Sequence, residues 1–351
     1  MNYHFRKEAL QRSLTCWQRV APCLGCNISV MDSLGNHWHS ASGYAQLESD
    51  NPLQPLSKCY IYSISKVFTA IRILQLVKQG RMVLDEKVAV YLGDLGLSSD
   101  ITVRQLLNHT AGVPNYTGFS EYDPAVKERP GQPWGFAETL RRAGEQEADF
   151  PPGEGWEYSN TGYMLLARLI EVVTDQSYDH NITQHIIHPL GLQNTRVATD
   201  IDRGELIPGY SRKLNHEGIL QDITSIYHPG WCHTGVLTST TEDICQLFIA
   251  LFNGKLIDAE LLDEMCGFVS IGRRAGDFFP NPGYGLGLMI DPDWGTAGLY
   301  GHGGEGPGFN TWAVYIPDFN GHWLAITIFC NTSMPGQPVH LVSDLLRTLS
   351  A

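Results

Sequence analysis

The chain has 351 residues, 43 % of them hydrophobic, which is enough for a large buried core in one domain or in two interlocked ones. The formal charge of −13 argues against nucleic acid or acidic membrane surfaces as partners and leaves a small molecule or a peptide as the candidate substrate. No apolar run approaches the roughly 20 residues that span a bilayer, and the N-terminal stretch predicts a charged amphipathic helix and not a signal peptide. Taken at face value, this predicts a cytoplasmic protein, or a periplasmic or secreted one if the sequence is a processed form.

The cysteines and histidines give little support for a metal site. The eight cysteines follow no even framework, and most stand in apolar surroundings, as reduced core thiols do. Cys23 and Cys26 form the only close pair, and no second pair completes a zinc site. His37 and His39 would lie on one face of a strand, but no third ligand is near them. We therefore predict no metal.

The N-terminal part of the chain predicts a helix, a β-hairpin and then one long helix. In order, these are a helix at 4–21, strands at 27–32 and 37–44 with a turn at 33–36, and a helix from Ser63 to Gly80. Apolar side chains cover most of the circumference of the last helix, which predicts that it is buried. We expect the rest of the chain to be organised around it.

The middle of the chain is predicted to be mostly helical. The segment 115–155 is rich in proline, glycine and aromatic residues without a sustained period, which predicts a long ordered loop that could line a site. The other elements expected here are a capped helix within 102–114, helices at 162–173 and 178–188, an irregular hairpin at 208–222, a capped helix entered at 235–243 that ends near 252, and a helix at 258–266.

The C-terminal part predicts strands. They are expected at 284–290, 298–302, 310–316 and 323–330, followed by a closing helix at 339–349. The N-terminal hairpin has too few strands to be stable alone, so we expect it to join these strands in one antiparallel sheet. The predicted fold is α+β. Its sheet lobe comprises 1–62 and 270–351, an inserted and mostly helical lobe comprises 63–269, and the active site lies between them.

Lys66 stands in the first turn of the long buried helix, where an ammonium is costly unless it is paired or loses its proton. Residues three apart lie on the same helix face, so the Lys66 amine can reach the Ser63 hydroxyl. A lysine whose pKa is lowered by burial and by the helix N-terminus can take the serine proton. The simpler alternative is a serine cap followed by a lysine whose amine extends to solvent.

Three short motifs stand at element boundaries where their side chains can converge. They are Ser63-Ile-Ser-Lys66, Tyr158-Ser-Asn160 and His302-Gly-Gly304. Their order resembles the superfamily of penicillin-binding proteins and class C β-lactamases, which includes DD-carboxypeptidases, D-aminopeptidases and β-lactamase-like esterases. The stretches 106–114, 152–160 and 235–243 are similar to the connecting signatures of that family, so the resemblance covers nearly the whole chain. It implies a β-lactamase/transpeptidase-like fold and no cofactor.

The resemblance also implies catalytic roles. Ser63 would be the nucleophile that becomes acylated, and Lys66 its proton partner. Tyr158 would move the proton to the leaving group and help to activate water. Asn160 would hold Lys66 and the substrate amide.

The third motif would form the edge of the substrate site. His302, Gly303 and Gly304 match the box on a sheet-edge strand, and the oxyanion hole maps to the backbone N–H groups of Ser63 and Glu305. Penicillin-hydrolysing members usually have Lys-Thr-Gly or Lys-Ser-Gly here. A histidine is only partly charged near pH 6 to 7, about its unperturbed pKa, and a glycine has no hydroxyl, so carboxylate recognition is expected to be weak.

Two expectations follow for the third box. Replacing His302 by lysine together with Gly303 by threonine should favour a cephalosporin as substrate. The sequence His233-Thr-Gly235 is a competing match, but it precedes a capped helix and does not lie on a strand that more strands follow. We therefore place the box at His302.

Three functions remain open. The first is a serine hydrolase that cleaves a D-amino-acid peptide, a β-lactam-like compound or a related amide through an acyl-enzyme. The second is a carboxylesterase of the same fold, because ester leaving groups need less protonation. The third is a non-catalytic penicillin-binding sensor. The sequence leaves the oligomeric state open.

Overall fold

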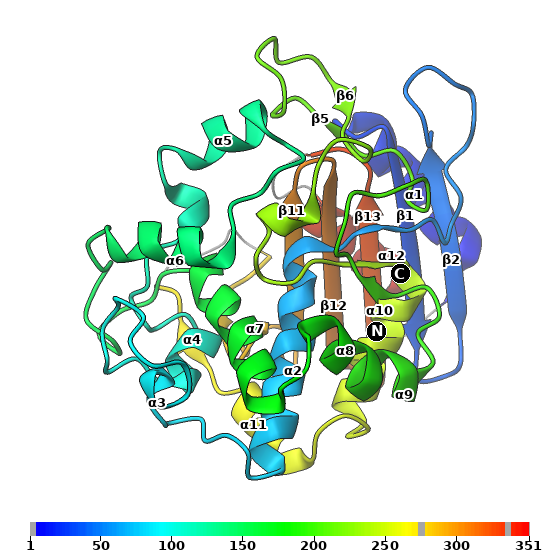
Figure 1. Ribbon diagram of the computed structural model, residues 1–351. Coiled ribbons are helices and arrows are strands. Elements are labelled where there is room, and N and C mark those ends of the chain that lie inside the picture. The colour runs from blue at the N-terminus through cyan, green and yellow to red at the C-terminus, as the bar shows by residue number, and fades with distance from the viewer. Residues whose placement is uncertain (1–4, 273–277, 334–337, 351) are drawn as a thin grey trace.

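The fold is centred on an eight-stranded antiparallel sheet, shown in a computed structural model that describes residues 5–272, 278–333 and 338–350 (Figure 1). In sheet order the strands are β2 (His37–Gly43), β1 (Gly25–Asp32), β13 (His322–Cys330), β12 (Phe309–Phe319), β11 (Leu299–Gly306), β10 (Met289–Asp291), β9 (Gly283–Tyr284) and β8 (Val269–Ser270). The N-terminal hairpin β1–β2 thus joins the C-terminal strands through β13, which confirms the predicted single sheet.

Both faces of the sheet are covered, which explains why every residue of β1 is buried. Helices α1 (Lys7–Val20) and α12 (Pro338–Ser350) pack on one face (Figure 1). Ile28 and Ile328, a cross-strand pair, belong to the core on that side. Helix α10 (Thr241–Phe252) packs on the other face, where Thr241 contacts Ser29 of β1. The α+β class and the flanking terminal helices are therefore as predicted.

The long helix α2 (Ser65–Lys78) packs against α7 and α8 (Figure 1). The other helices are α3 (Val88–Leu92), α4 (Val103–Leu107), α5 (Tyr122–Glu128), α6 (Phe136–Gly144), α7 (Asn160–Thr174), α8 (Tyr178–Ile182), α9 (His188–Leu190) and α11 (Ala259–Met265). The short helical turns are η1 (Tyr62–Ile64), η2 (Tyr116–Gly118), η3 (Thr183–Ile187) and η4 (Pro229–Trp231). Two small sheets contain β3 (Cys59–Tyr60), β7 (Leu237–Ser239) and β4 (Arg196–Val197), and β5 (Tyr210–Ser211) and β6 (Gln221–Asp222).

Several predicted elements differ from the structure. The segment 115–155 is not an irregular loop, because it contains η2, α5 and α6; Glu138 and Arg142 form an ion pair one turn apart in α6. The single strand expected at 284–290 is two short strands separated by a glycine-containing turn. The first helix begins at Lys7, and residue 4 of the predicted helix lies outside the described residues. No described helix is both long enough and apolar enough to cross a bilayer.

Candidate active site

Ser63 lies at the entrance to α2, although not as a helix cap. It belongs to the 3₁₀ turn η1, and the α-helix itself begins at Ser65 without a side-chain cap. The preceding residue, Tyr62, has a φ of 45°, in the left-handed region that a tyrosine rarely adopts. Such backbone strain is found preferentially at functional sites, where the surrounding structure holds it.

Lys66 is completely buried one turn after Ser63. Its Nζ lies 3.0 Å from Ser63 Oγ and donates a hydrogen bond to Asn160 Oδ1 at 2.7 Å. Burial lowers the pKa of Lys66 to about 7, so a substantial share of the amine is neutral near physiological pH. A neutral amine at this distance from a hydroxyl can accept its proton.

Asn160 begins α7, and its amide is oriented by the segment that precedes α5. Its Nδ2 donates to Asn115 Oδ1 at 3.2 Å and to Thr117 Oγ1 at 3.3 Å, which directs Oδ1 toward Lys66. Both N–H groups of the amide therefore have partners within the protein. The sequence predicted the contact with Lys66 but not Asn115 and Thr117, whose roles depend on the fold of the 115–155 segment.

Tyr158 faces Lys66 and Ser63. The Lys66 amine lies 4.8 Å from the centroid of its ring. Burial raises the pKa of Tyr158, and a hydrogen bond with Ser63 opposes part of this rise. The phenol is therefore protonated at neutral pH and lies close enough to the serine to interact with it. The side chains that the sequence predicted to converge, Ser63, Lys66, Tyr158 and Asn160, are brought together.

His302 lies on β11 as expected, but its environment differs from the expectation. Its side chain is completely buried, with Nδ1 2.6 Å from Gly303 O and Nε2 2.8 Å from the Tyr284 hydroxyl. Burial, and then the charge of Lys66, lower the pKa of His302 to about 3. The expectation that His302 titrates near pH 6 to 7 is therefore wrong, because the ring has no contact with water that could stabilise the cation.

The two glycines of the third motif permit close contacts. A Cβ on Gly303 would lie 2.3 Å from Cζ3 of Trp312, its cross-strand partner on β12. A Cβ on Gly304 would lie 2.1 Å from the carbonyl oxygen of Ile61, so the glycine lets the chain before Ser63 approach the sheet. A threonine at 303 would therefore require the Trp312 indole to move, and the effect of the His302→Lys, Gly303→Thr pair on a cephalosporin stays a prediction.

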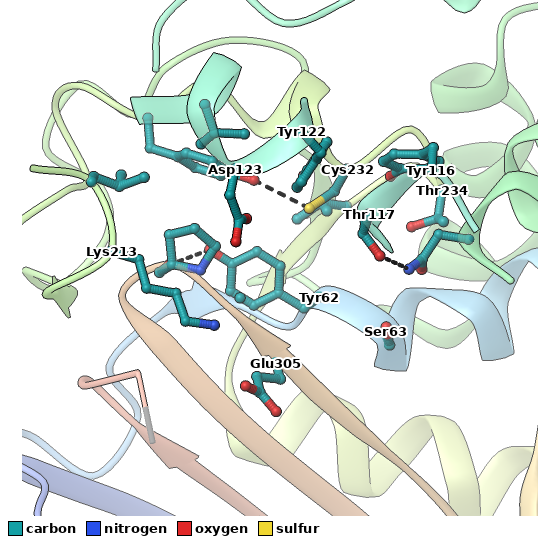
Figure 2. Close-up of a pocket in the computed structure, with 17 residues that line it drawn as sticks. Tyr62, Ser63, Tyr116, Thr117, Tyr122, Asp123, Lys213, Cys232, Thr234 and Glu305 are labelled. Atoms are coloured by element: carbon teal, nitrogen blue, oxygen red, sulfur yellow. Dashed lines mark hydrogen bonds between the residues drawn. The ribbon is translucent and has the colours of Figure 1, made fainter. Parts of the chain in front are cut away.

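A cavity of about 300 Å³ opens beside Ser63 (Figure 2). Asn160 and Glu305 line it, and Tyr62 and three further tyrosines contribute to its walls. Figure 2 shows charged side chains around it, namely Asp123, Lys213 and Glu305. His302, Gly303 and Gly304 are not among its lining residues. Of the residues that line the cavity, the sequence predicted only Ser63, Asn160 and Glu305 as site residues.

His233, the competing candidate for the third box, lies behind the cavity wall. Its Nε2 is 2.9 Å from Thr139 Oγ1, and its ring packs edge-on against Tyr116. Burial lowers the pKa of His233 to about 4. Its neighbours in the chain, Cys232 and Thr234, line the cavity, but His233 itself does not.

The residues weighed as metal ligands have other partners. His39 Nδ1 lies 2.7 Å from Ser29 Oγ, and its Nε2 faces Glu242 at 3.7 Å. Cys23 and Cys26 are buried free thiols. Among residues 5–272, 278–333 and 338–350, no three histidine, cysteine or acidic side chains are grouped so that they could hold a metal ion.

Comparison with known proteins gives a consistent match. A family model described as Beta-lactamase matches residues 20–347. Penicillin-binding protein 4* of Bacillus subtilis (strain 168) is 29 % identical over 308 residues, which cover 80 % of this chain and 63 % of that protein. The putative penicillin-binding protein PbpX of the same organism is 26 % identical over 76 % of this chain and 61 % of its own. The chain thus spans less than two thirds of the length of either relative.

Solved structures match over nearly the whole chain. The D-stereospecific amidohydrolase from Streptomyces sp. is 30 % identical, with a TM-score of 0.83 and coverage of 97 % of this chain and 98 % of that one. The octameric penicillin-binding protein homologue from Pyrococcus abyssi is 26 % identical, with a TM-score of 0.80 over 99 % of this chain and 77 % of that one. The D-amino acid amidase from Ochrobactrum anthropi SV3, at 23 % identity and a TM-score of 0.85 over 98 % and 99 % of the two chains, shares the fold.

Proposed function

The chain belongs to the β-lactamase family, and from this we propose that it is a serine hydrolase that cleaves an amide of a D-amino acid through an acyl-enzyme on Ser63. The observation that supports this most directly is the position of Lys66, a completely buried amine 3.0 Å from the Ser63 hydroxyl with a pKa of about 7. A lysine in a merely structural role would instead be expected to have a carboxylate partner or an exposed amine.

In the first step, Ser63 Oγ attacks the amide carbonyl carbon while its proton passes to the neutral Lys66 amine. The carbonyl oxygen becomes an oxyanion, which the backbone N–H groups of Ser63 and Glu305 would stabilise. Asn160 keeps the Lys66 amine directed at the serine through the 2.7 Å hydrogen bond.

In the second step, the bond between the carbonyl carbon and the leaving nitrogen breaks. Tyr158, whose ring centroid lies 4.8 Å from the Lys66 amine, relays the proton from Lys66 to that nitrogen, and the amine departs. A water molecule then attacks the ester on Ser63 and gives its proton to the Lys66–Tyr158 pair. The pair passes this proton to Ser63 Oγ as the acyl–oxygen bond breaks and the acid is released. The two half-reactions together convert amide and water into carboxylic acid and amine.

The third motif favours a substrate without a carboxylate next to the scissile bond. His302 is neutral, with a pKa of about 3, and Trp312 fills the space where a hydroxyl-bearing side chain would stand at position 303. Positions 302 and 303 therefore supply neither the cation nor the hydroxyl that would hold a carboxylate. The 30 % identity to a D-stereospecific amidohydrolase supports an amide of a D-amino acid over a β-lactam or a D-Ala-D-Ala peptide.

A panel of substrates tests the proposal. It comprises a D-amino-acid amide and its L enantiomer, a D-Ala-D-Ala peptide, a p-nitrophenyl ester and a chromogenic cephalosporin. We expect the highest kcat/KM among the amides for the D enantiomer. Hydrolysis of the ester alone would instead identify a carboxylesterase, and labelling by a β-lactam without turnover of any substrate would identify a sensor.

Ser63→Ala provides the control for every member of the panel. We expect it to abolish turnover and labelling by a fluorophosphonate while circular dichroism shows the same fold, because Ser63 is at a helix entrance and not in the packed core. Labelling of this variant at the wild-type rate would contradict the assignment of the nucleophile.

A further inference from the structure

His109 contacts the segment that contains Tyr158 from three directions. Its backbone carbonyl accepts a hydrogen bond from the N–H of Glu157 at 3.1 Å, and its ring Nδ1 accepts one from the N–H of Ser159 at 3.1 Å. Its ring also lies against Tyr158, with 4.3 Å between the centroids. The residues before and after Tyr158, and the tyrosine ring itself, are therefore all held by one histidine.

The backbone of His109 is strained where these contacts form. Its φ is 64°, in the left-handed region, although it is not a glycine. Such a conformation costs on the order of 1 kcal/mol or more and persists only where surrounding contacts hold it. If this position served only to turn the chain, glycine or asparagine would suit the left-handed backbone better than histidine. The contacts of His109 to residues 157–159 therefore suggest a reason for the histidine.

The hydrogen bonding of the His109 ring also argues against a role in packing alone. Because Nδ1 accepts a hydrogen bond, the neutral ring has its proton on Nε2. That Nε2 is buried and has no hydrogen-bond partner among the residues that the structure describes. Burial, and then the charge of Lys66, lower the pKa of His109 well below its usual value, so Nδ1 stays available as an acceptor. A phenyl ring would fill the same space without an unpaired N–H.

We infer that His109 is a positioning residue that fixes the Tyr158 hydroxyl between Ser63 and Lys66 by binding the backbone on both sides of the tyrosine and stacking on its ring. This inference rests on the proposed function, in which Tyr158 relays the proton to the leaving group. A tyrosine that is free to shift by about 1 Å would lose on the order of 100-fold in rate, the usual effect of such a misplacement.

Two variants separate the contacts. His109→Asn keeps an acceptor oxygen near the place of Nδ1 and suits the left-handed backbone, but it removes the ring. His109→Phe keeps the ring and removes the acceptor. We expect each to lower kcat for an amide by about 10- to 100-fold with KM within about twofold of wild type. His39→Asn is the matched control, because His39 is also hydrogen-bonded through Nδ1. It lies on β2, the edge strand of the sheet, which β1, β13 and β12 separate from β11.

The leaving group gives a readout that a merely structural role would not change. An amine must be protonated as it departs, whereas p-nitrophenolate need not be, so the variants should lose more activity on the amide than on the p-nitrophenyl ester. In the Tyr158→Phe background, His109→Asn should cause no further loss on the amide, because the hydroxyl that it positions is already absent. Equal losses on both substrates, losses that multiply in the double variant, or an unchanged kcat would each overturn the inference.

Folding and the proposed function are checked separately. Thermal melts show whether each variant is folded, and if neither His109 variant folds, the residue is structural and the inference is wrong. The rate of fluorophosphonate labelling of Ser63 reports on the activated serine without any substrate. If wild type is labelled but hydrolyses no amide, the proposed substrate is wrong; the inference then stands or falls on the ester kinetics of the double variant alone, where losses that multiply overturn it.

Discussion

Lys66 has no carboxylate partner among the described residues, and the hydrogen-bond partners of its amine are the neutral side chains of Ser63 and Asn160. Burial that no carboxylate offsets lowers its pKa to about 7. The deprotonated fraction of the amine increases as the pH rises to about 7. The kcat/KM for a neutral ester should therefore increase by about tenfold per pH unit below pH 7 and level off above it. The measurement is the pH profile of kcat/KM between pH 5 and 9 in buffers of constant ionic strength.

A control is needed for pH effects on the fold and on His302. Circular dichroism across the same range monitors the fold, and a pKa of about 3 places the titration of His302 below the range tested. A flat profile between pH 6 and 8 would show that Lys66 is not the base.

Because Gly303 lies against Trp312, we expect the effect of a substitution at 303 on stability to depend on the residue at 312. Gly303→Thr should lower stability by about 1–3 kcal/mol, the usual cost of overpacking, because its Cβ would meet the indole at 2.3 Å. In a Trp312→Ala background the same threonine should cost much less. Chemical denaturation of the four proteins of this cycle measures the difference.

Kinetics of the same four proteins test specificity. Only the Gly303→Thr, Trp312→Ala protein should gain activity on a cephalosporin relative to an amide, because only there does the threonine not meet the indole. Equal destabilisation by threonine in both backgrounds would show that the indole does not occupy this space.

At the residue scale, the sequence predicts contacts between residues that are close in one helix. It does not predict contacts between segments that only the fold brings together. Ser63 and Lys66 are one helical turn apart, so their contact could be predicted from the sequence. The state of His302 could not, because its burial depends on Tyr284, a residue on a different strand. His109 was within a recognised stretch, but its contacts to 157–159 depend on how two distant segments meet.

Among the elements, the packing of η1 on β11 determines where the serine lies. Gly304→Ala would place a Cβ 2.1 Å from the Ile61 carbonyl and displace the turn that contains Ser63. We expect a loss of about 1–3 kcal/mol in stability and slower fluorophosphonate labelling of Ser63. Thermal melts and labelling kinetics measure the two effects.

Gly135→Ala is the matched control, because no atom lies within 4 Å of the position of its Cβ and its φ is negative. It should retain the wild-type labelling rate. If Gly304→Ala labelled as fast as Gly135→Ala, close contact between η1 and β11 would not be required for the reactivity of Ser63.

Elements with strong periodicity were predicted well, and those set by tertiary contacts were not. The long helix, the terminal helices and the strands β1, β12 and β13 follow their hydrophobic patterns. Helices α5 and α6 were missed because proline and glycine interrupt the pattern around them, while their stability comes from aromatic packing such as that of Tyr122 on Trp231. The strand pair β9–β10 was merged into one because the turn between them is itself apolar.

In the whole molecule, one of the two buried clusters among the described residues joins the sheet to the helices. The same buried cluster contains Met31 and Phe329 of the sheet together with Phe68 of α2 and Leu247 of α10. We therefore predict that the helical lobe proposed at 63–269 does not unfold separately. Tryptophan fluorescence and far-UV circular dichroism should report one coincident transition in urea. Two transitions, with one probe preceding the other, would indicate that the helical part is an independent unit.

The close contact of Gly303 with Trp312 also restricts the order in which this protein could acquire a new specificity. A threonine at 303 that arises first meets the indole, whereas a smaller residue at 312 that arises first opens the space that the threonine needs. Evolution toward carboxylate recognition would therefore pass through position 312 before position 303. The accessible route is set by a residue outside the motif, on the neighbouring strand.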